Sequence, residues 1–291
     1  MTSRTDIVEA FAPAKINLFL HVGEKRDDGF HELESLVVFA EAGDALSFAP
    51  SGALTLTLDG PFAAGLQADG DNLVLRAARA LATRAGRGAA AAIALTKNLP
   101  IASGIGGGSA DAAATLRGLV RLWGLDVAWP ELREIAAKLG SDVPVCVESR
   151  AAWMEGRGER ITPAGSLPAM AMVLVNPGVF VSTADVFRTL SERRGTGAVD
   201  HSARLHTRSD VIALLKATNN DLEAPARAIA PVIADVLDEL SRMPGVQFCR
   251  MSGSGASCFA LFEDDSVAEM AAIALSHSHP NWWVQATRIV S

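Results

Sequence analysis

Apolar positions along the first hundred residues tend to alternate with polar ones, and β-branched residues are frequent there. Alternation with a period of two is typical of a strand with one buried face, whereas spacings of three and four are typical of an amphipathic helix. The pattern predicts strands over residues 16–22, 34–41, 45–48, 54–58 and 91–96, with a helix over 71–84. Further on it predicts helices over 109–122 and 129–139 and a short buried strand over 143–147.

The second half of the chain mixes the two periodicities. Strands are predicted over 170–175, 246–251, 257–262 and 282–290, and helices over 182–194, 209–215, 222–229, 231–242 and 267–276. A Gly-Ser-Leu-Pro run at 165–168 is a candidate boundary. Strands followed by mixed elements, with no steady alternation of strand and helix, favour two α+β units over a doubly wound sheet.

Composition narrows the functional classes. The chain has 291 residues, of which 49% are apolar and 20% charged, as is usual for a folded globular protein. Its net charge of −7 argues against nucleic acid or an anionic membrane as the main partner. Cys146, Cys249 and Cys258 are distant from one another and form no Cys-x-x-Cys motif, which argues against a disulfide framework or zinc knuckle.

Reduced thiols of this kind fit the cytosol. We find no apolar run that resembles a secretory signal or is long enough to cross a bilayer, so we expect a cytoplasmic protein.

A glycine-rich segment gives the strongest chemical signal. Four glycines, at positions 104, 106, 107 and 108, directly precede a predicted alanine-rich helix. Such a loop can turn its N–H groups inward around a phosphate, aided by the partial positive charge of the helix N-terminus. We expect close phosphate approach and positive φ angles at Gly107 and Gly108. The alternative is a tight turn with Ser109 as the N-cap and Asp111 in the first turn.

Polar groups on predicted strands form further candidates. Lys15 and Asn17 share one face of a strand, and a lysine among apolar residues there requires an anion or a carboxylate, unless it sits at an edge in solvent. Asp142 begins the strand predicted over 143–147, where a simple turn aspartate is the alternative. Phe30 and His31 could combine stacking with hydrogen bonding, or simply precede a strand. A second Gly/Ser loop at 251–258 could be no more than a hairpin turn.

Together these segments resemble the GHMP kinase superfamily, named for galactokinase, homoserine kinase, mevalonate kinase and phosphomevalonate kinase. Residues 100–113 carry the superfamily pattern. Segments 13–18, 26–31 and 139–144 resemble a subfamily that acts on a cytidylyl methylerythritol, as do 220–223 and 251–257.

The resemblance implies a two-domain α+β GHMP kinase fold. Residues 1–163 would form a nucleotide-binding domain like domain 2 of ribosomal protein S5, with a left-handed βαβ crossover. Residues 164–291 would form a ferredoxin-like α/β sandwich. The implied reaction moves the γ-phosphoryl group of ATP to the 2-hydroxyl of the erythritol moiety, in the non-mevalonate route to isoprenoid precursors. We expect a monomer or a weak homodimer.

The resemblance also implies roles for individual residues. Asp142 matches the catalytic aspartate and Lys15 its lysine partner. Asn72 and Lys97 fall where adenine is met, and Asn17, Phe30, His31, Thr183 and Phe187 fall on the substrate side. The triphosphate loop comprises Pro100, Ile101, Ala102, Ser103, Gly104, Ile105, Gly106, Gly107, Gly108, Ser109 and Ala110. Mg²⁺ would bridge ATP oxygens, with Ser109 the best protein contact, since no dedicated carboxylate cage is visible.

Three positions depart from the family pattern. Phe30 stands where tyrosine is usual, which keeps a stacking surface but loses a phenolic hydrogen bond. Ile105 replaces leucine and Ala110 replaces serine, and neither change removes a backbone donor. Two other functions remain open: another small-molecule kinase of the superfamily, which would accept substrates without cytidine, and an ATP-binding sensor without activity. The presence of both Asp142 and Lys15 argues against the sensor.

Overall fold

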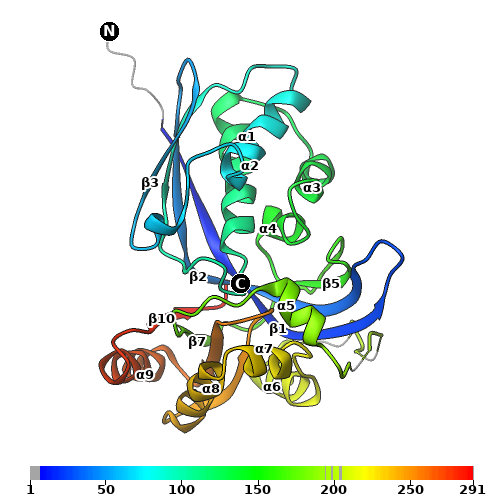
Figure 1. Cartoon of the computed structure of the whole chain (residues 1–291), viewed down its shortest axis with the longest axis vertical. Coiled ribbons are helices and arrows are strands. Elements are labelled where there is room, and N and C mark those ends of the chain that lie inside the picture. Colours follow the sequence, from blue (N-terminus) through cyan, green and yellow to red (C-terminus); the bar gives the residue numbers. More distant parts are fainter. Residues whose placement is uncertain (1–6, 194, 198, 203–204, 291) are drawn as a thin grey trace. The chain divides into compact units, whose positions relative to one another are not determined.

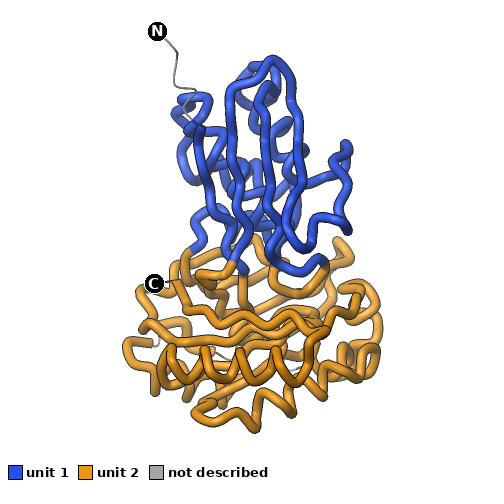
Figure 2. The backbone as a smooth tube through the Cα atoms, turned by 90° about the vertical axis from the view of Figure 1, so that its left-hand side faces the viewer, with its two compact units in different colours: residues 1–14, 43–101, 106–149 blue, residues 15–42, 102–105, 150–291 orange. Residues whose placement is uncertain are grey.

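The computed structural model describes residues 7–290 apart from 194, 198, 203 and 204. The chain divides into two compact units, coloured separately in Figure 2: unit 1 holds residues 1–14, 43–101 and 106–149, and unit 2 holds 15–42, 102–105 and 150–291. Strands β1 (Val8–Lys25) and β2 (His31–Ala49) contribute residues to both units. The predicted boundary after residue 163 cuts the sequence at one point, whereas each compact unit combines several segments. That boundary stays a prediction.

Unit 1 is built on strands and four α-helices of the described chain (Figure 1). β3 (Leu54–Asp59) pairs in parallel with β4 (Ala91–Thr96), and β4 pairs antiparallel with residues 45–49 of β2. A short 3₁₀ turn (Ala63–Gly65) and helix α1 (Leu73–Arg84) connect β3 to β4. The other helices are α2 (Gly107–Trp123), α3 (Trp129–Ala137) and α4 (Val143–Glu148). The hand of the β3–α1–β4 crossover stays a prediction.

Close packing of α2 in unit 1 depends on small residues. Its buried positions include Ala110, Ala112, Ala113 and Ala114. At Gly118 an added Cβ would lie 2.2 Å from the ring of Phe48 on β2. Real carbon atoms do not approach that closely, so glycine is required for this helix to lie against the strand.

Unit 2 contains a second set of strands. Residues 33–37 of β2 pair with β5 (Ala152–Gly156), which pairs with β6 (Arg160–Pro163). A separate antiparallel sheet has the order β10 (Trp283–Arg288), β7 (Ala171–Asn176), β9 (Cys258–Phe262), β8 (Val246–Met251).

Helices cover one face of that separate sheet, as Figure 1 shows. The helices that contact its strands are α6 (Arg208–Ala217), α8 (Val232–Arg242) and α9 (Asp265–Ser278), while α5 (Thr183–Thr189) packs against α7 (Glu223–Ile229). Alternate residues of β7 and β9, such as Val173 and Ala260, join one apolar cluster with Ile233 and Val236 of α8 and Leu275 of α9. The alternation follows from the strand period of two. The helices and strands of both units together confirm the expected α+β fold class.

Most predicted elements are present, but one is of the wrong type. The apolar run 143–147, predicted as a strand, forms helix α4. All five residues are buried, so the run carries no periodic signal, and Pro144 stands within the first turn of the helix. The two strands predicted over 34–41 and 45–48 are one continuous strand, β2. None of the helices in the described part of the chain is long and apolar enough to span a membrane.

Candidate active site

The first part of the glycine loop, residues 102–105, is held within unit 2 by the second Gly/Ser loop. The Ser257 N–H donates to Ser103 O at 3.0 Å, and the Ser252 hydroxyl donates to Gly104 O at 3.2 Å. The Lys15 N–H donates to Ile105 O at 2.9 Å. The loop at 251–258 is therefore more than a hairpin turn, since it fixes the backbone of the glycine segment.

Two glycines allow these loops to approach each other. Gly104 has φ +76°, and an added Cβ would lie 2.6 to 2.8 Å from three backbone atoms of Ser252 and Gly255. Gly253 has φ +56°, and its added Cβ would lie 2.7 Å from Gly104 O. Any side chain at either position would force the two backbones apart.

The second part of the glycine segment begins α2 in unit 1. Gly106, with φ 63°, is the N-cap residue, and it provides no side-chain cap. Ser109 is the third helical residue, so the alternative in which it caps the helix is wrong. The expectation of positive φ at Gly107 and Gly108 is also wrong, since the left-handed residues are Gly104 and Gly106. Helix geometry leaves the N–H groups of the first turn without intrahelical acceptors, as a phosphate cradle requires.

A buried ion cluster lies beside the start of α2. The Lys97 ammonium is 2.5 Å from Asp44 Oδ2 and 2.6 Å from Asp111 Oδ2, and all three side chains are almost fully buried. Asp44 Oδ1 also accepts the N–H groups of Asn98 and Leu99, which fixes the segment leading into the glycine loop. An added Cβ on Gly107 would lie 3.1 Å from Lys97 Nζ, so the ammonium directly adjoins the first turn.

Two carboxylates share one ammonium in this cluster. Burial raises the pKa of Asp111 to about 7; Lys97 opposes this rise and Asp44 adds to it. Asp111 Oδ1 has no hydrogen-bond partner among the described residues, whereas the Asp44 carboxylate accepts from three donors. A proton on Asp111 leaves the cluster close to neutral, which limits repulsion of a phosphate at the helix start.

This raised pKa predicts a pH-dependent stability. Folded Asp111 holds a proton that the unfolded chain releases, so the stability it confers is lost as pH rises from 3.8 towards about 7. The free energy of unfolding of the wild type, minus that of Asp111→Asn, should therefore fall by at most roughly 1.4 kcal/mol per pH unit. Urea unfolding of both proteins at several pH values between about 5 and 8 measures this difference. Parallel curves for the two proteins would contradict the prediction.

The two residues expected to contact adenine, Asn72 and Lys97, both bind other groups of the protein. Asn72 is the N-cap of α1: its Oδ1 accepts from Val74 N at 3.0 Å, and its Nδ2 donates to Gln67 O at 2.9 Å. Lys97 is only 2% exposed. Contact of either residue with adenine stays a prediction.

Asp142 directly precedes α4, not a strand. It is the N-cap residue of this six-residue helix, with helical backbone angles and no side-chain cap bond. Its side chain is partly exposed, while the next five residues are buried. The carboxylate is thus carried at the surface end of a buried helix.

Lys15 and Asn17 lie together on β1 in unit 2, as their spacing predicted. Lys15 Nζ donates to Asn17 Oδ1 at 2.9 Å, and Asn17 Nδ2 donates to Ser35 Oγ at 2.8 Å. The Asn17 N–H also donates to Ser252 Oγ at 3.1 Å. Both side chains are buried, so the alternative of a solvent-exposed edge lysine is wrong.

Of the residues expected on the substrate side, His31 and Phe187 contact each other within unit 2. The rings of His31 and Phe187 stack with centroids 5.4 Å apart and an angle of 22°. Thr183, on the same helix as Phe187, shares a 2.8 Å hydrogen bond with Ser254 of the second Gly/Ser loop. Phe30 is 49% exposed, and the Arg157 guanidinium lies 5.5 Å from the centre of its ring.

One supporting residue was noted in the sequence only as part of a motif. Asn220 is buried, and its Nδ2 donates to Met251 O at 2.9 Å and to Gly253 O at 2.8 Å. It therefore holds the backbone of the second Gly/Ser loop through two of its carbonyls. Sequence reasoning gave no reason for an asparagine at this position.

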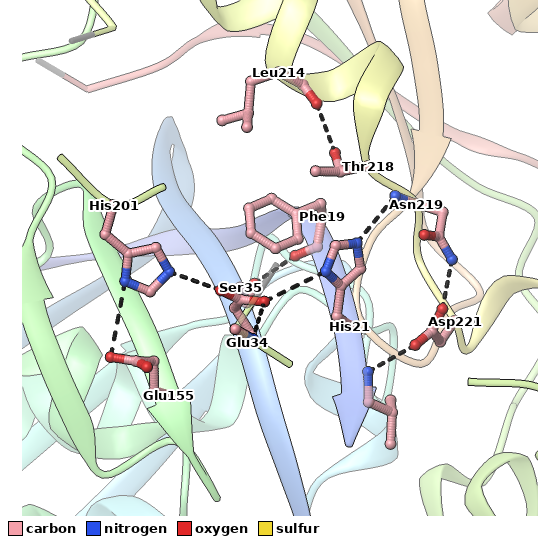
Figure 3. Close-up of polar contacts among 12 residues, drawn as sticks. Phe19, His21, Glu34, Ser35, Glu155, His201, Leu214, Thr218, Asn219 and Asp221 are labelled. Atoms are coloured by element: carbon pink, nitrogen blue, oxygen red, sulfur yellow. Dashed lines mark hydrogen bonds and ion pairs between the residues drawn. The ribbon is translucent and has the colours of Figure 1, made fainter. Parts of the chain in front are cut away.

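A polar cluster in unit 2 escaped the sequence analysis entirely. Figure 3 shows the buried Glu34 carboxylate between the rings of His21 and His201. His201 Nε2 lies 2.9 Å from Glu34 Oε1, and Gly197 N donates to Oε2 at 2.9 Å. The His201 ring stacks on Trp153 with centroids 4.5 Å apart. Glu34 thus fastens part of the segment after α5 to β2, and nothing local in the sequence marks this pairing.

Comparison with known proteins places these features in a family. The sequence matches the family model of the GHMP kinases N terminal domain over residues 72–150 and that of the GHMP kinases C terminal over residues 203–279. A relative from Ruegeria pomeroyi, a 4-diphosphocytidyl-2-C-methyl-D-erythritol kinase, is 52% identical over 285 residues, which cover 97% of this chain and 99% of the relative.

Solved structures agree with the sequence matches. The crystal structure of a 4-(cytidine 5'-diphospho)-2C-methyl-D-erythritol kinase has a TM-score of 0.79 and 33% identity, covering 97% of this chain and 100% of that one. Homoserine kinase from Cytophaga hutchinsonii has a TM-score of 0.73 at 18% identity, covering 100% of this chain and 96% of that one, and shares the fold.

Proposed function

The chain belongs to the GHMP kinase family, and from this premise we propose that it is a 4-diphosphocytidyl-2-C-methyl-D-erythritol kinase. It transfers the γ-phosphoryl group of ATP to the 2-hydroxyl of that substrate, a step in making isoprenoid precursors by the non-mevalonate route. The observation that carries the proposal is 52% identity to a relative of that name over nearly the full length of both chains. The stacking of His31 on Phe187 and the hydrogen bond between Thr183 and Ser254 in unit 2 support it.

On the nucleotide side, the glycine segment receives the triphosphate. The first-turn N–H groups of α2 donate to phosphate oxygens, and the helix dipole favours their negative charge. The Ser109 hydroxyl, at the third position of the helix, is the protein group best suited to touch Mg²⁺. Mg²⁺ at such sites is held mainly by substrate phosphates and water, so Ser109 would be its protein contact and the ion would supply charge neutralisation.

Asp142 and Lys15 have the roles that phosphoryl transfer requires of side chains. Asp142 accepts the proton of the attacking hydroxyl, a contribution usually worth about 10²–10⁴ in rate. Lys15 offsets negative charge as the phosphoryl group moves. Its ammonium is oriented by Asn17 Oδ1, which the Ser35 hydroxyl holds in place through the other end of the amide.

The cytidine end of the acceptor is recognised in unit 2. Phe30 stacks on the cytosine ring, and His31 reads the base edge while its own ring is supported by Phe187. Thr183 and Asn17 contact the remainder of the substrate. Asn17 bonds to Ser252 and Thr183 bonds to Ser254, so one loop fixes the positions of both residues.

Release of ADP in the presence of three acceptors tests this function. The enzyme should consume ATP with the cytidylyl substrate but not with 2-C-methyl-D-erythritol 4-phosphate or with homoserine. Faster turnover with either acceptor lacking cytidine would assign the chain to a different kinase of the family. ATP binding without turnover on any acceptor would indicate a sensor. The cytoplasmic location and the monomeric or weakly dimeric state stay predictions.

Phe30 provides a test of the acceptor side alone. Phe30→Ala should raise the KM for the cytidylyl substrate by roughly one to two orders of magnitude, because base stacking on an aromatic ring is worth about 1–3 kcal/mol. Phe30→Tyr keeps the ring face and should be nearly neutral. Steady-state kinetics with each substrate varied in turn measure both effects. A rise in the KM for ATP alone would mean that the two nucleobase sites are assigned in reverse.

A further inference from the structure

Arg117, near the middle of α2, binds the end of α4 within unit 1. Its Nη1 donates to Cys146 O at 2.7 Å and to Val147 O at 3.1 Å, and lies 3.5 Å from Ser149 Oγ. Its Nη2 donates to Phe11 O on β1 at 2.7 Å. One guanidinium therefore joins three elements, and two of its bonds go to the C-terminal carbonyls of the short helix that follows Asp142.

Helix α4 depends on such external support. A helix of six residues is far below the length at which isolated helices are stable, and its last carbonyls have no intrahelical donors. A cation at this end both satisfies carbonyls and opposes the negative pole of the helix. The chain then leaves α4 through Ser149, which has φ 51°, an uncommon conformation for a residue other than glycine.

Arg117 connects the helix that follows the proposed base, Asp142, to the helix that begins at the glycine segment. Arg117 lies ten residues after Gly107, so the helix that begins at the glycine segment also holds the end of the helix that begins at Asp142. Apolar packing buries α4, but the side chains involved are small and similar, chiefly valines. Directed bonds to named carbonyls restrict sliding and rotation of a helix that valine packing alone restrains weakly.

We propose that Arg117 is a positioning residue: by holding the C-terminal carbonyls of α4 it sets the placement of the Asp142 carboxylate relative to the start of α2. This inference rests on the base role of Asp142 in the proposed function. Loss of the guanidinium should lower kcat and leave the KM values for both substrates nearly unchanged, because binding groups stay in place while the base is displaced.

The test compares two arginines of one helix. Arg117→Met should lower kcat by about 10- to 100-fold, the cost of misplacing a catalytic group by roughly 1 Å. Arg121→Met is the matched control, since Arg121 binds Glu9 O on β1 but makes no bond to α4. It should keep wild-type kcat. Arg117→Lys, which keeps the charge and can reach one carbonyl, should recover part of the loss even if Arg117→Met is poorly folded.

A double variant separates positioning from stability. In an Asp142→Asn background the base is already absent, so Arg117→Met should cost no further turnover in sensitive single-turnover assays. The same loss in both backgrounds, or an equal loss in Arg121→Met, would overturn the positioning role. Near-wild-type turnover of Asp142→Asn alone would instead remove the base assignment. Low turnover of that variant with an unchanged kcat for Arg117→Met would refute the positioning role only.

Discussion

Replacing Asp142 by asparagine is expected to reduce turnover by about 10²–10⁴-fold or more while ATP still binds. Asparagine has the same shape but cannot accept the hydroxyl proton. The fold should tolerate the change, because Asp142 is partly exposed and the new side chain fills the same space. ADP release measures the turnover, and calorimetry measures the ATP affinity.

A matched control is available in the same unit. Asp126 is an exposed aspartate between α2 and α3, and Asp126→Asn makes the same chemical change without touching the proposed site. It should retain wild-type turnover. If Asp142→Asn stays within a factor of about ten of the wild type, Asp142 is not the base.

Replacing Gly104 by alanine is expected to be the most damaging change in the glycine segment. The new Cβ would lie within 2.6 to 2.8 Å of three backbone atoms, and the backbone is in the left-handed region at φ +76°. The clash and the unfavourable φ together should cost about 3 kcal/mol or more of stability. ATP affinity should fall by at least about tenfold, because the segment that receives the triphosphate must shift.

Gly165 separates the two contributions. It has the same φ of +76° and belongs to the same unit, but an added Cβ there would meet nothing within 4 Å. Gly165→Ala should therefore cost only about 1–2 kcal/mol, the penalty for the backbone angle, and should leave ATP affinity unchanged. Urea unfolding and calorimetry on both variants make the comparison. Equal losses of stability would show that the approach of the two loops is unimportant.

The glycine segment shows which features of a loop can be predicted from its local sequence and which cannot. Four glycines ahead of an alanine-rich helix indicated a loop that enters a helix, and this is what the structure contains. That Gly104 has no room for a side chain did not follow, because the backbone atoms that its added Cβ would meet belong to Ser252 and Gly255, in a distant part of the sequence. Gly107 and Gly108, where positive φ angles were expected, are ordinary helical residues.

The wrongly predicted strand at 143–147 has a similar cause. A fully buried run of five apolar residues has no polar face, so its periodicity cannot distinguish strand from helix. The segments around this run favour a helix: α2 and α3 pack against α4, and Arg117 binds its terminal carbonyls. The contacts with α2 and Arg117 are not local in sequence, since Arg117 lies 29 positions before Cys146.

The sequence by itself determined most of the periodic elements, the α+β fold class, the glycine loop that enters α2 and the residues that resemble the family's site. These depend on neighbours within a few positions, where spacing and residue type decide the backbone. Only the tertiary structure decided that Lys97 is held between Asp111 and Asp44, the latter 53 positions away, and that Glu34 meets His201 across 167 positions. Such pairs form because burial makes an unpaired charge costly, and burial is fixed by how distant segments pack.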